Sequence, residues 1–284
     1  MIATTMTAYV RPSDLAAALT ALQRGGLSIV AGGTDHYPAR VGRPLTEDVL
    51  DIGGLRDLCG ISFEHDRWRI GAATTWTDLL QADLPPAFAG LKAAAREVGG
   101  VQIQNAGTVC GNVCNASPAA DGVPPLLALD ARVELRSTRG RREVPLGDFI
   151  VGPRRTVRTE DELVTALLIP AGTDAVGAFR KLGARRYLVI SIVMAAGVVE
   201  LDAAGRIRAI RVAVGACSPV ARRLPLLEAA LLGQPIEGAA GLIRPAHLEG
   251  LAPIDDVRAS RDYRSDAALT VVRDLLADLS AVAA

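Results

Sequence analysis

Two glycine-rich stretches are the residues of this 284-residue chain whose types and spacing could do chemistry. AGGTD, residues 31–35, follows a short apolar run, and NAGTVCGNVCNASPAAD, residues 105–121, carries no charge before its final Asp121. Glycine lets another molecule approach the main chain closely, and successive exposed N–H groups form a concavity that binds anions. Each stretch alone is also typical of a plain turn packed by small side chains. Together they favour a ligand with several phosphate oxygens, such as a pyrophosphate.

Short polar side chains in the same stretches could add contacts to such a ligand. Thr34, Thr108 and Asn112 supply small polar groups beside the freed backbone of Gly107 and Gly111, and Asp121 could accept hydrogen bonds from a ribose hydroxyl. The chain contains neither G-x-G-x-x-G nor G-x-x-x-x-G-K-[ST], the signatures of Rossmann and Walker loops. A dinucleotide would therefore need another scaffold.

Other reactive residues do not assemble into a site along the sequence. Cys110 and Cys114 have no further cysteine or histidine near them, whereas a metal or iron–sulfur centre wants three or four ligands; we read them as small buried thiols. The histidines are scattered: His36, His65 and His247. Ser117 lies in N-A-S-P-A rather than in the G-x-S-x-G elbow of many hydrolases. We predict no metal site and no catalytic side chain.

The composition limits the kinds of partner that the chain is expected to bind. The formal net charge of zero gives no support for binding to nucleic acid or to an anionic membrane surface. The N-terminal MIATTMTAYV lacks a basic region followed by a long apolar run, so we expect neither a signal peptide nor a transmembrane span. Four cysteines without an export signal indicate reduced thiols in the cytoplasm.

The elements that position the glycine stretches alternate between helix and strand in the first part of the chain. A helix capped by Ser13 precedes a buried strand at residues 27–30, and another strand follows in DVLDIGG. Further elements are expected as a strand at 68–72, helices at 74–81 and 86–98, a hairpin turning near 138–140 and an extended run at 162–170.

A boundary is predicted at residues 171–177 (AGTDAVG), which are small and turn-forming. Beyond it, a long apolar core strand at 187–201, a returning strand at 206–216 and helices near 222–232 and 265–279 predict a small antiparallel sheet backed by helices. We interpret the basic residues of this half in two groups. Lys181, Arg185 and Arg186 would form a solvated patch, and Arg258, Arg261 and Arg264 would flank a helix or face a partner subunit.

Seven segments, in order and spacing, resemble the FAD-binding medium subunit of molybdenum hydroxylases, the enzymes of the xanthine dehydrogenase and carbon monoxide dehydrogenase type. The resemblance covers essentially the whole chain and is carried by AGGTD, GAATTWTDL, QIQNAGTVCGNVCNASPAAD, PLLALDARVEL, ELVTALLIP, FRKLGARR and DDVRASRDYR. It implies an α+β fold: a two-subdomain FAD-binding domain of the PCMH (vanillyl-alcohol-oxidase-like) type at residues 1–172, divided into 1–56 and 57–172. A small C-terminal domain of antiparallel sheet plus helices would occupy residues 173–284.

The resemblance also implies which residues bind the cofactor. AGGTD and the T-V-x-G-N segment would hold the FAD pyrophosphate, Asp121 matches the aspartate that follows N-A-S-P, and Val164 and Lys181 match positions close to the flavin. The implied FAD-binding set is Ile29, Val30, Ala31, Gly32, Gly33, Thr34, Asp35, His36, Thr75, Gly107, Thr108, Val109, Cys110, Gly111, Asn112, Asp121, Val164 and Lys181.

Three positions depart from the family pattern. Cys110 replaces a glycine common in relatives, Gln104 replaces an arginine, and His36 replaces an apolar residue. We expect Cys110 to narrow the approach to the phosphates and His36 to contact them or the adenosine.

The function implied by the resemblance is electron transfer. A large subunit would oxidise the substrate at a molybdenum cofactor, and [2Fe–2S] clusters on a small subunit would pass the electrons to FAD on this chain and on to NAD or another acceptor. Lys181 would then lie near the flavin or an incoming nucleotide. Two alternatives stay open: a stand-alone FAD-dependent oxidoreductase, and a flavin-free assembly or binding protein.

Overall fold

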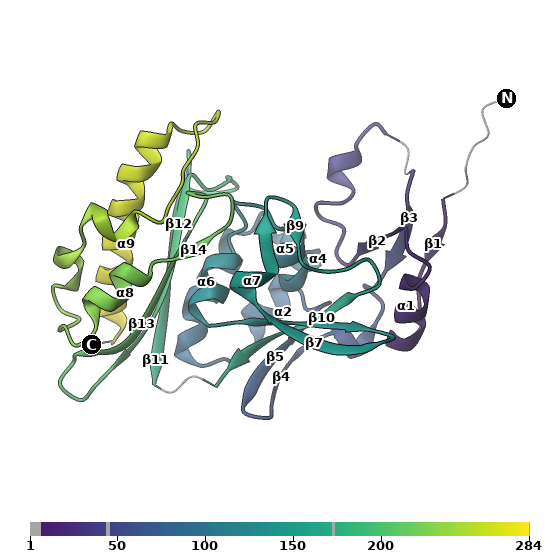
Figure 1. Ribbon diagram of the computed structural model, residues 1–284, viewed down its shortest axis with the longest axis horizontal. Helices are drawn as coiled ribbons and strands as arrows, with labels where there is room; N and C mark the ends of the chain where they lie inside the picture. The colour runs from purple at the N-terminus through teal and green to yellow at the C-terminus, as the bar shows by residue number, and fades with distance from the viewer. Residues whose placement is uncertain (1–6, 44–45, 172–173, 284) are drawn as a thin grey trace.

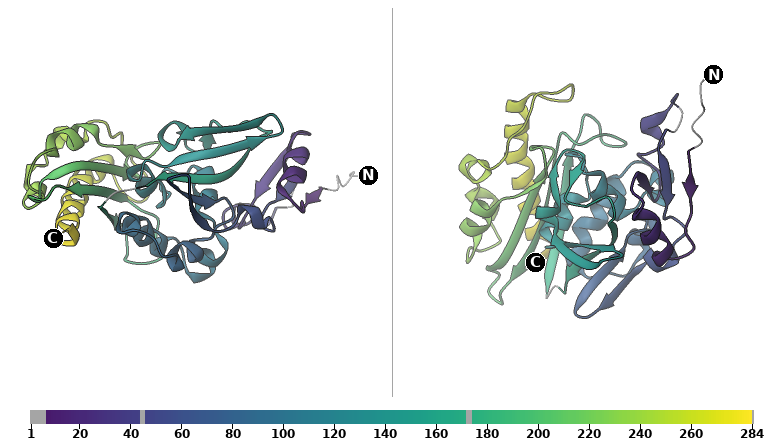
Figure 2. Two further views of the ribbon diagram at one scale, coloured as in Figure 1. Left: turned by 90° about the horizontal axis from the view of Figure 1, so that it is seen from below. Right: turned by 45° about the vertical axis from the view of Figure 1, so that its right-hand side comes forward.

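The computed structural model describes residues 7–43, 46–171 and 174–283, arranged as a row of sheets (Figure 1). Figures 1 and 2 show the N-terminal sheet and the C-terminal sheet at opposite ends of the molecule, with a five-stranded sheet between them. Among the described helices, none has the length and apolar character needed to cross a bilayer. Residues 1–6, which bear on the predicted lack of a signal peptide, lie outside the described residues, as do Gly172 and Thr173 at the predicted boundary.

The N-terminal sheet is parallel and has the strand order β1-β3-β2. Its elements are β1 (Tyr9–Val10), α1 (Leu15–Leu22), β2 (Leu27–Val30), the 3₁₀ helix η1 (Pro38–Arg40) and β3 (Asp48–Asp51). The predicted strands are confirmed, but the predicted helix cap is wrong. Asp14, not Ser13, caps α1, because its carboxylate accepts a hydrogen bond of 2.8 Å from the N–H of Ala17, where a negative charge also favours the helix start.

The middle sheet is antiparallel, with the order β4-β5-β10-β6-β7. The predicted hairpin and strands are confirmed. The elements are η2 (Arg56–Leu58), β4 (Ile61–Glu64), β5 (Arg67–Gly71), α2 (Trp76–Gln81), η3 (Pro86–Phe88), α3 (Ala89–Glu97), α4 (Val101–Ala106), α5 (Val109–Asn115), α6 (Val123–Ala128), β6 (Arg132–Ser137), β7 (Gly140–Pro145), α7 (Leu146–Phe149), β8 (Ile150–Gly152), β9 (Arg155–Thr156) and β10 (Leu163–Pro170).

The stretch 105–121 is not the open loop that its composition suggests. Helices α4 and α5 meet at Gly107 and Thr108, and the Thr108 hydroxyl caps α5 by accepting a hydrogen bond of 3.0 Å from the N–H of Gly111. Val109 and Val113 face the core and are fully buried. Gly111 therefore lies in a helical turn, and the non-helical parts of the stretch are the Gly107–Thr108 junction and the turns at residues 116–121.

The C-terminal sheet is antiparallel, in the order β11-β12-β13-β14, as predicted. Helix α9 packs against β11 and β12, and helices α3 and α6 also contact these strands. Alternate residues of β12, such as Val198 and Val199, belong to two different hydrophobic cores. The elements are β11 (Ala175–Leu182), β12 (Val193–Leu201), β13 (Ile207–Gly215), β14 (Arg222–Arg223), α8 (Pro225–Leu231), η4 (Ala239–Leu242), η5 (Pro245–Leu248) and α9 (Arg261–Ala283).

Two predictions for this half are corrected. The apolar run 187–201 is strand only from Val193; Leu188 and Ile190 before it are about half exposed. Arg264 is not a surface charge, since it is 3% exposed. Its guanidinium donates to the carbonyls of Ile192 and Ala216 and to the Asp256 carboxylate, and these contacts offset the cost of burying the charge, although Nε has no hydrogen-bond partner among the described residues.

Candidate cofactor site

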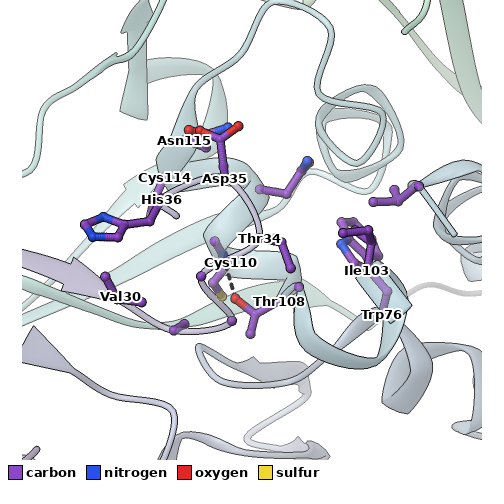
Figure 3. Close-up of a pocket in the computed structure, with 18 of the residues that line it drawn as sticks. Val30, Thr34, Asp35, His36, Trp76, Ile103, Thr108, Cys110, Cys114 and Asn115 are labelled. Atoms are coloured by element: carbon purple, nitrogen blue, oxygen red, sulfur yellow. Dashed lines mark hydrogen bonds between the residues drawn. The ribbon is translucent and has the colours of Figure 1, made fainter. Parts of the chain in front are cut away.

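A cavity of about 920 Å³ lies between the N-terminal sheet, helix α5, strand β10 and the segment 188–190 (Figure 3). Its volume is near the upper end of the range for small-molecule sites. The wall therefore combines segments from all parts of the fold, and a ligand in it would touch each of them.

The glycine turn after β2 forms one wall of this cavity. A Cβ atom on Gly32 would overlap the carbonyl oxygen of Ala106, so only glycine lets the turn rest on the α4–α5 junction. Gly33 has a φ of +67°, a conformation that glycine adopts without strain. Arg154 donates to the Asp35 carboxylate at 2.9 Å and also to the side chain of Asn115 at the end of α5. The two glycine stretches are thus held side by side.

Unpaired main-chain donors collect where the two stretches meet. Within residues 7–43 and 46–171, the N–H groups of Gly32, Gly33, Thr34 and Asp35 donate to no protein acceptor, and neither do those of Thr108 and Cys110. Unpaired donors on converging turns make an anion-binding concavity. The buried Oδ1 of Asn112, on the same wall, also lacks a hydrogen-bond partner. The free donors fit the oxygens of a phosphate-bearing cofactor, whereas the free acceptor Oδ1 of Asn112 fits a hydroxyl or N–H group of such a cofactor.

A buried ion pair closes another part of the wall. The Lys181 ammonium lies 2.7 Å from Oδ2 of Asp121, and the Ser191 hydroxyl donates to Oδ1 at 2.6 Å. The two charged side chains are 6% and 11% exposed, so the solvated-patch reading is wrong for Lys181. Burial raises the pKa of the Asp121 carboxyl above its usual value, although Lys181 and Ser191 oppose the rise.

The cavity wall includes every residue of the predicted set except Thr75, Val109 and Lys181. Thr75 caps α2 and forms a β-bridge with Thr108, so it supports the junction from behind. Val109 lies fully in the core. Lys181 reaches the wall through Asp121.

The departures from the family pattern leave the phosphate approach open. Cys110 is 2% exposed, and its Sγ faces the carbonyls of Ile70 and Gly71 in the core. Burial keeps the pKa of this thiol well above its usual value. The expected narrowing by Cys110 is therefore wrong, since only its main chain offers a contact. Gln104 is also buried and donates to the carbonyl of Arg96 at 3.2 Å.

His36 lies on the cavity wall in a charged corner. Its Nε2 is 3.9 Å from the Glu47 carboxylate, and its ring packs edge-on against Tyr37. Burial, followed by the charge of Arg40, lowers the pKa of His36, while Glu47 opposes the change. The imidazole is thus held neutral near pH 7.

Several wall residues were not predicted from the sequence. Among them, Trp76 and Ile103 lie together on one side of the glycine turn, and Cys114 lies on the other side, together with the predicted Val30 (Figure 3). Of the unpredicted wall residues, only the segment 188–190 could have been suspected from the sequence, because the apolar run 187–201 is too long for an average strand. Other unpredicted residues of the wall include Arg40, Ile52, Asn115, Arg158 and Leu163.

Among the described residues, no group of three or more His, Cys, Asp or Glu side chains could hold a metal ion. The four cysteines are all free: Cys59, Cys110, Cys114 and Cys217.

Comparison with known proteins assigns this fold and cavity to a family. Residues 4–172 match the FAD binding domain in molybdopterin dehydrogenase, and residues 178–279 match the CO dehydrogenase flavoprotein C-terminal domain. The chain therefore belongs to the FAD-binding subunits of the molybdenum hydroxylase family, and its α+β fold is the one predicted.

Particular relatives extend over almost the whole chain. The xanthine dehydrogenase FAD-binding subunit of Escherichia coli O157:H7 is 31% identical over 287 residues, covering 97% of this chain and 96% of the relative. The carbon monoxide dehydrogenase medium chain of Hydrogenophaga pseudoflava is 28% identical, covering 94% and 95%. A solved carbon monoxide dehydrogenase from that organism superposes with a TM-score of 0.86 at 28% identity over 98% of each chain.

Proposed function

We propose that FAD binds in this cavity with its pyrophosphate between the two glycine stretches. The amides of Gly32 to Asp35 on one side, and of Thr108 and Cys110 on the other, supply the donors. The observation that carries the proposal is that these unpaired donors from two segments border one cavity. Each hydrogen bond from a neutral donor to an anionic oxygen contributes about 1.5–3 kcal/mol.

We also place the flavin end of FAD near Trp76, Ile103 and Asp121. Gly122, next to Asp121, packs against the Trp76 ring, so these residues share one end of the cavity. The exposed Leu188 and Ile190 border the same end through the contact of Leu188 with Gly100. An isoalloxazine placed here lies near the molecular surface, where electrons can enter and leave.

The function that follows is that of an electron-transfer subunit. Bound FAD accepts electrons singly and delivers them as a pair, and the protein supplies binding, orientation and electrostatics. Electrons would come from [2Fe–2S] clusters on a small partner subunit, which receives them from a molybdenum cofactor on a large subunit. NAD or another molecule is the proposed acceptor. The names of the relatives, which include the medium subunit of a nicotine 6-hydroxylase and the medium chain of a carbon monoxide dehydrogenase, support this role.

Two further assignments go with this function. We divide the chain into an FAD-binding domain at residues 1–172, with subdomains 1–56 and 57–172, and a C-terminal domain at 173–284. The family matches, which end at residue 172 and begin again at residue 178, support this division. We place the protein in the cytoplasm, where its four free thiols would persist.

The test is titration of flavin-free protein with FAD, followed by flavin fluorescence, in the wild type and two glycine variants. Gly33→Ala forces a side chain onto a φ of +67° and toward Tyr37, which turns the amides of the cradle away. Gly205→Ala is the matched control, because Gly205 has a φ of +70° and open space around it. We expect Gly33→Ala to weaken FAD binding at least tenfold and Gly205→Ala to leave it unchanged. Equal binding by all three proteins would refute the cradle, and no binding by the wild type would refute the function.

A further inference from the structure

Arg158 is a cationic residue of the cavity wall that the proposed cradle does not use. Its Nη1 donates to the carbonyls of Thr159 at 3.0 Å and Glu162 at 2.9 Å, so two main-chain anchors fix the guanidinium. Over the described ranges, no carboxylate lies within ion-pair distance of Arg158. Two other charged residues of the wall have ion-pair partners, since Arg40 pairs with Glu47 and Asp35 with Arg154. Arg158 therefore keeps an uncompensated charge and free donors beside the cavity.

The position of Arg158 can be read from its neighbours. It lies close enough to Cys114 that its charge lowers the pKa of that thiol, against the larger effect of burial. Its anchor Glu162 directly precedes Leu163, another wall residue. Cys114 lies with Val30 on one side of the glycine turn, opposite Trp76 and Ile103 (Figure 3). Arg158 therefore belongs to the Val30 side of the cavity.

The two sides of the cavity offer different surroundings. The Trp76 side carries Asp121 and leads to the exposed segment 188–190, where electron exchange requires access. The Val30 side includes the apolar side chains of Ile52 and Leu163, both nearly inaccessible to solvent, next to the charged corner at His36 (Figure 3). Apolar side chains with a planar cation at their border suit a flat heteroaromatic ring that takes no part in redox chemistry.

We propose that the Arg158 guanidinium contacts the adenine ring of FAD and makes this chain select FAD over FMN. This inference rests on the proposed function. Arginine planes stack on nucleobases, and their forked donors also match acceptor nitrogens at the edge of a base. FMN lacks the adenosine half, so it would fill the flavin side and leave Arg158 without a partner.

The experiment compares FAD and FMN binding to the flavin-free wild type, Arg158→Met and Arg155→Met, by fluorescence titration. Arg155 is exposed, three residues away and not part of the wall, which makes it the matched control. We expect Arg158→Met to weaken FAD binding at least tenfold without changing FMN binding, and Arg155→Met to change neither. Displacement by ADP should weaken in the same variant, whereas displacement by inorganic pyrophosphate should not.

Two outcomes overturn the inference: FAD binding that survives Arg158→Met unchanged, or a loss of the same factor for FAD and FMN. Retained FMN binding also shows that a variant is folded. If Arg158→Met does not fold, the same comparison of FAD and FMN is made with Arg158→Lys, which retains the positive charge but not the planar guanidinium. Failure of the wild type to bind FAD refutes the proposed function and this inference with it. Wild-type selectivity that persists in both Arg158 variants refutes the inference alone.

Discussion

Lys181→Met is expected to destabilise the flavin-free protein in a pH-dependent way. The substitution keeps the side-chain length but leaves Asp121 as a buried carboxylate whose remaining side-chain hydrogen bond, over the described residues, comes from Ser191. Removing one partner of a buried ion pair costs about 3–5 kcal/mol. Because Ser191 remains and Asp121 can take up a proton, we expect about 3 kcal/mol, measured as free energy of unfolding in urea at about pH 8.

The direction of the pH dependence follows from the pKa of Asp121. Burial already raises this pKa in the wild type, and Lys181 opposes the rise. Without Lys181 the folded state holds the proton over a wider pH range in which the unfolded chain has lost it. Where the folded state binds more protons, stability falls as pH increases. The loss caused by Lys181→Met should therefore be smaller at about pH 5 than at about pH 8.

Two control variants test whether the loss of stability comes from the buried charge of Asp121. Lys92→Met removes an ammonium that donates to the carbonyl of Ala82, so its effect should not depend on pH in this range. The double variant Lys181→Met/Asp121→Asn removes the buried charge and should recover part of the stability. A loss of the same size at both pH values, or a double variant no more stable than the single one at about pH 8, would refute the reasoning.

Two further predictions concern residues whose burial the sequence did not reveal. Arg264→Met leaves the carbonyls of Ile192 and Ala216 without their buried donor, so it should lower the free energy of unfolding in urea by about 3 kcal/mol, at about 1–3 kcal/mol per unsatisfied group. Arg261→Met, at an exposed position of the same helix, should change it by no more than about 0.5 kcal/mol. Equal losses in the two variants would contradict the burial of Arg264. Alkylation of the native protein followed by peptide mass spectrometry should modify Cys59, which is exposed, before Cys110 and Cys217, which are buried; early modification of Cys110 would show that its thiol does not face the core.

The sequence predicted the parts of this site that rest on local backbone chemistry. Gly32 and Gly33 follow a buried strand, and this pattern alone indicated a turn that another molecule could approach. The strands and the hairpin near residues 138–140 were predicted for the same reason, since turn residues and alternation are local signals. Residues 109–115 were misread as part of a loop because small residues weaken helix periodicity, whereas the Thr108 cap and the buried Val109 and Val113 make this segment helical.

Contacts between distant residues were beyond the sequence. Lys181 and Asp121 are separated by 60 positions, and nothing local marks either as buried. Arg264 read as a surface charge because its partners are main-chain carbonyls on another element, which leave no pattern in the sequence. Arg158 likewise gains its place on the wall only through the fold, where two carbonyls and Cys114 surround it.

A crystal structure of the chain with bound FAD tests the central claim most directly. The account predicts pyrophosphate oxygens within about 3 Å of main-chain nitrogens from both segments, 32–35 and 108–110. A pyrophosphate bound by only one of these segments, or FAD bound outside the cavity, would contradict it.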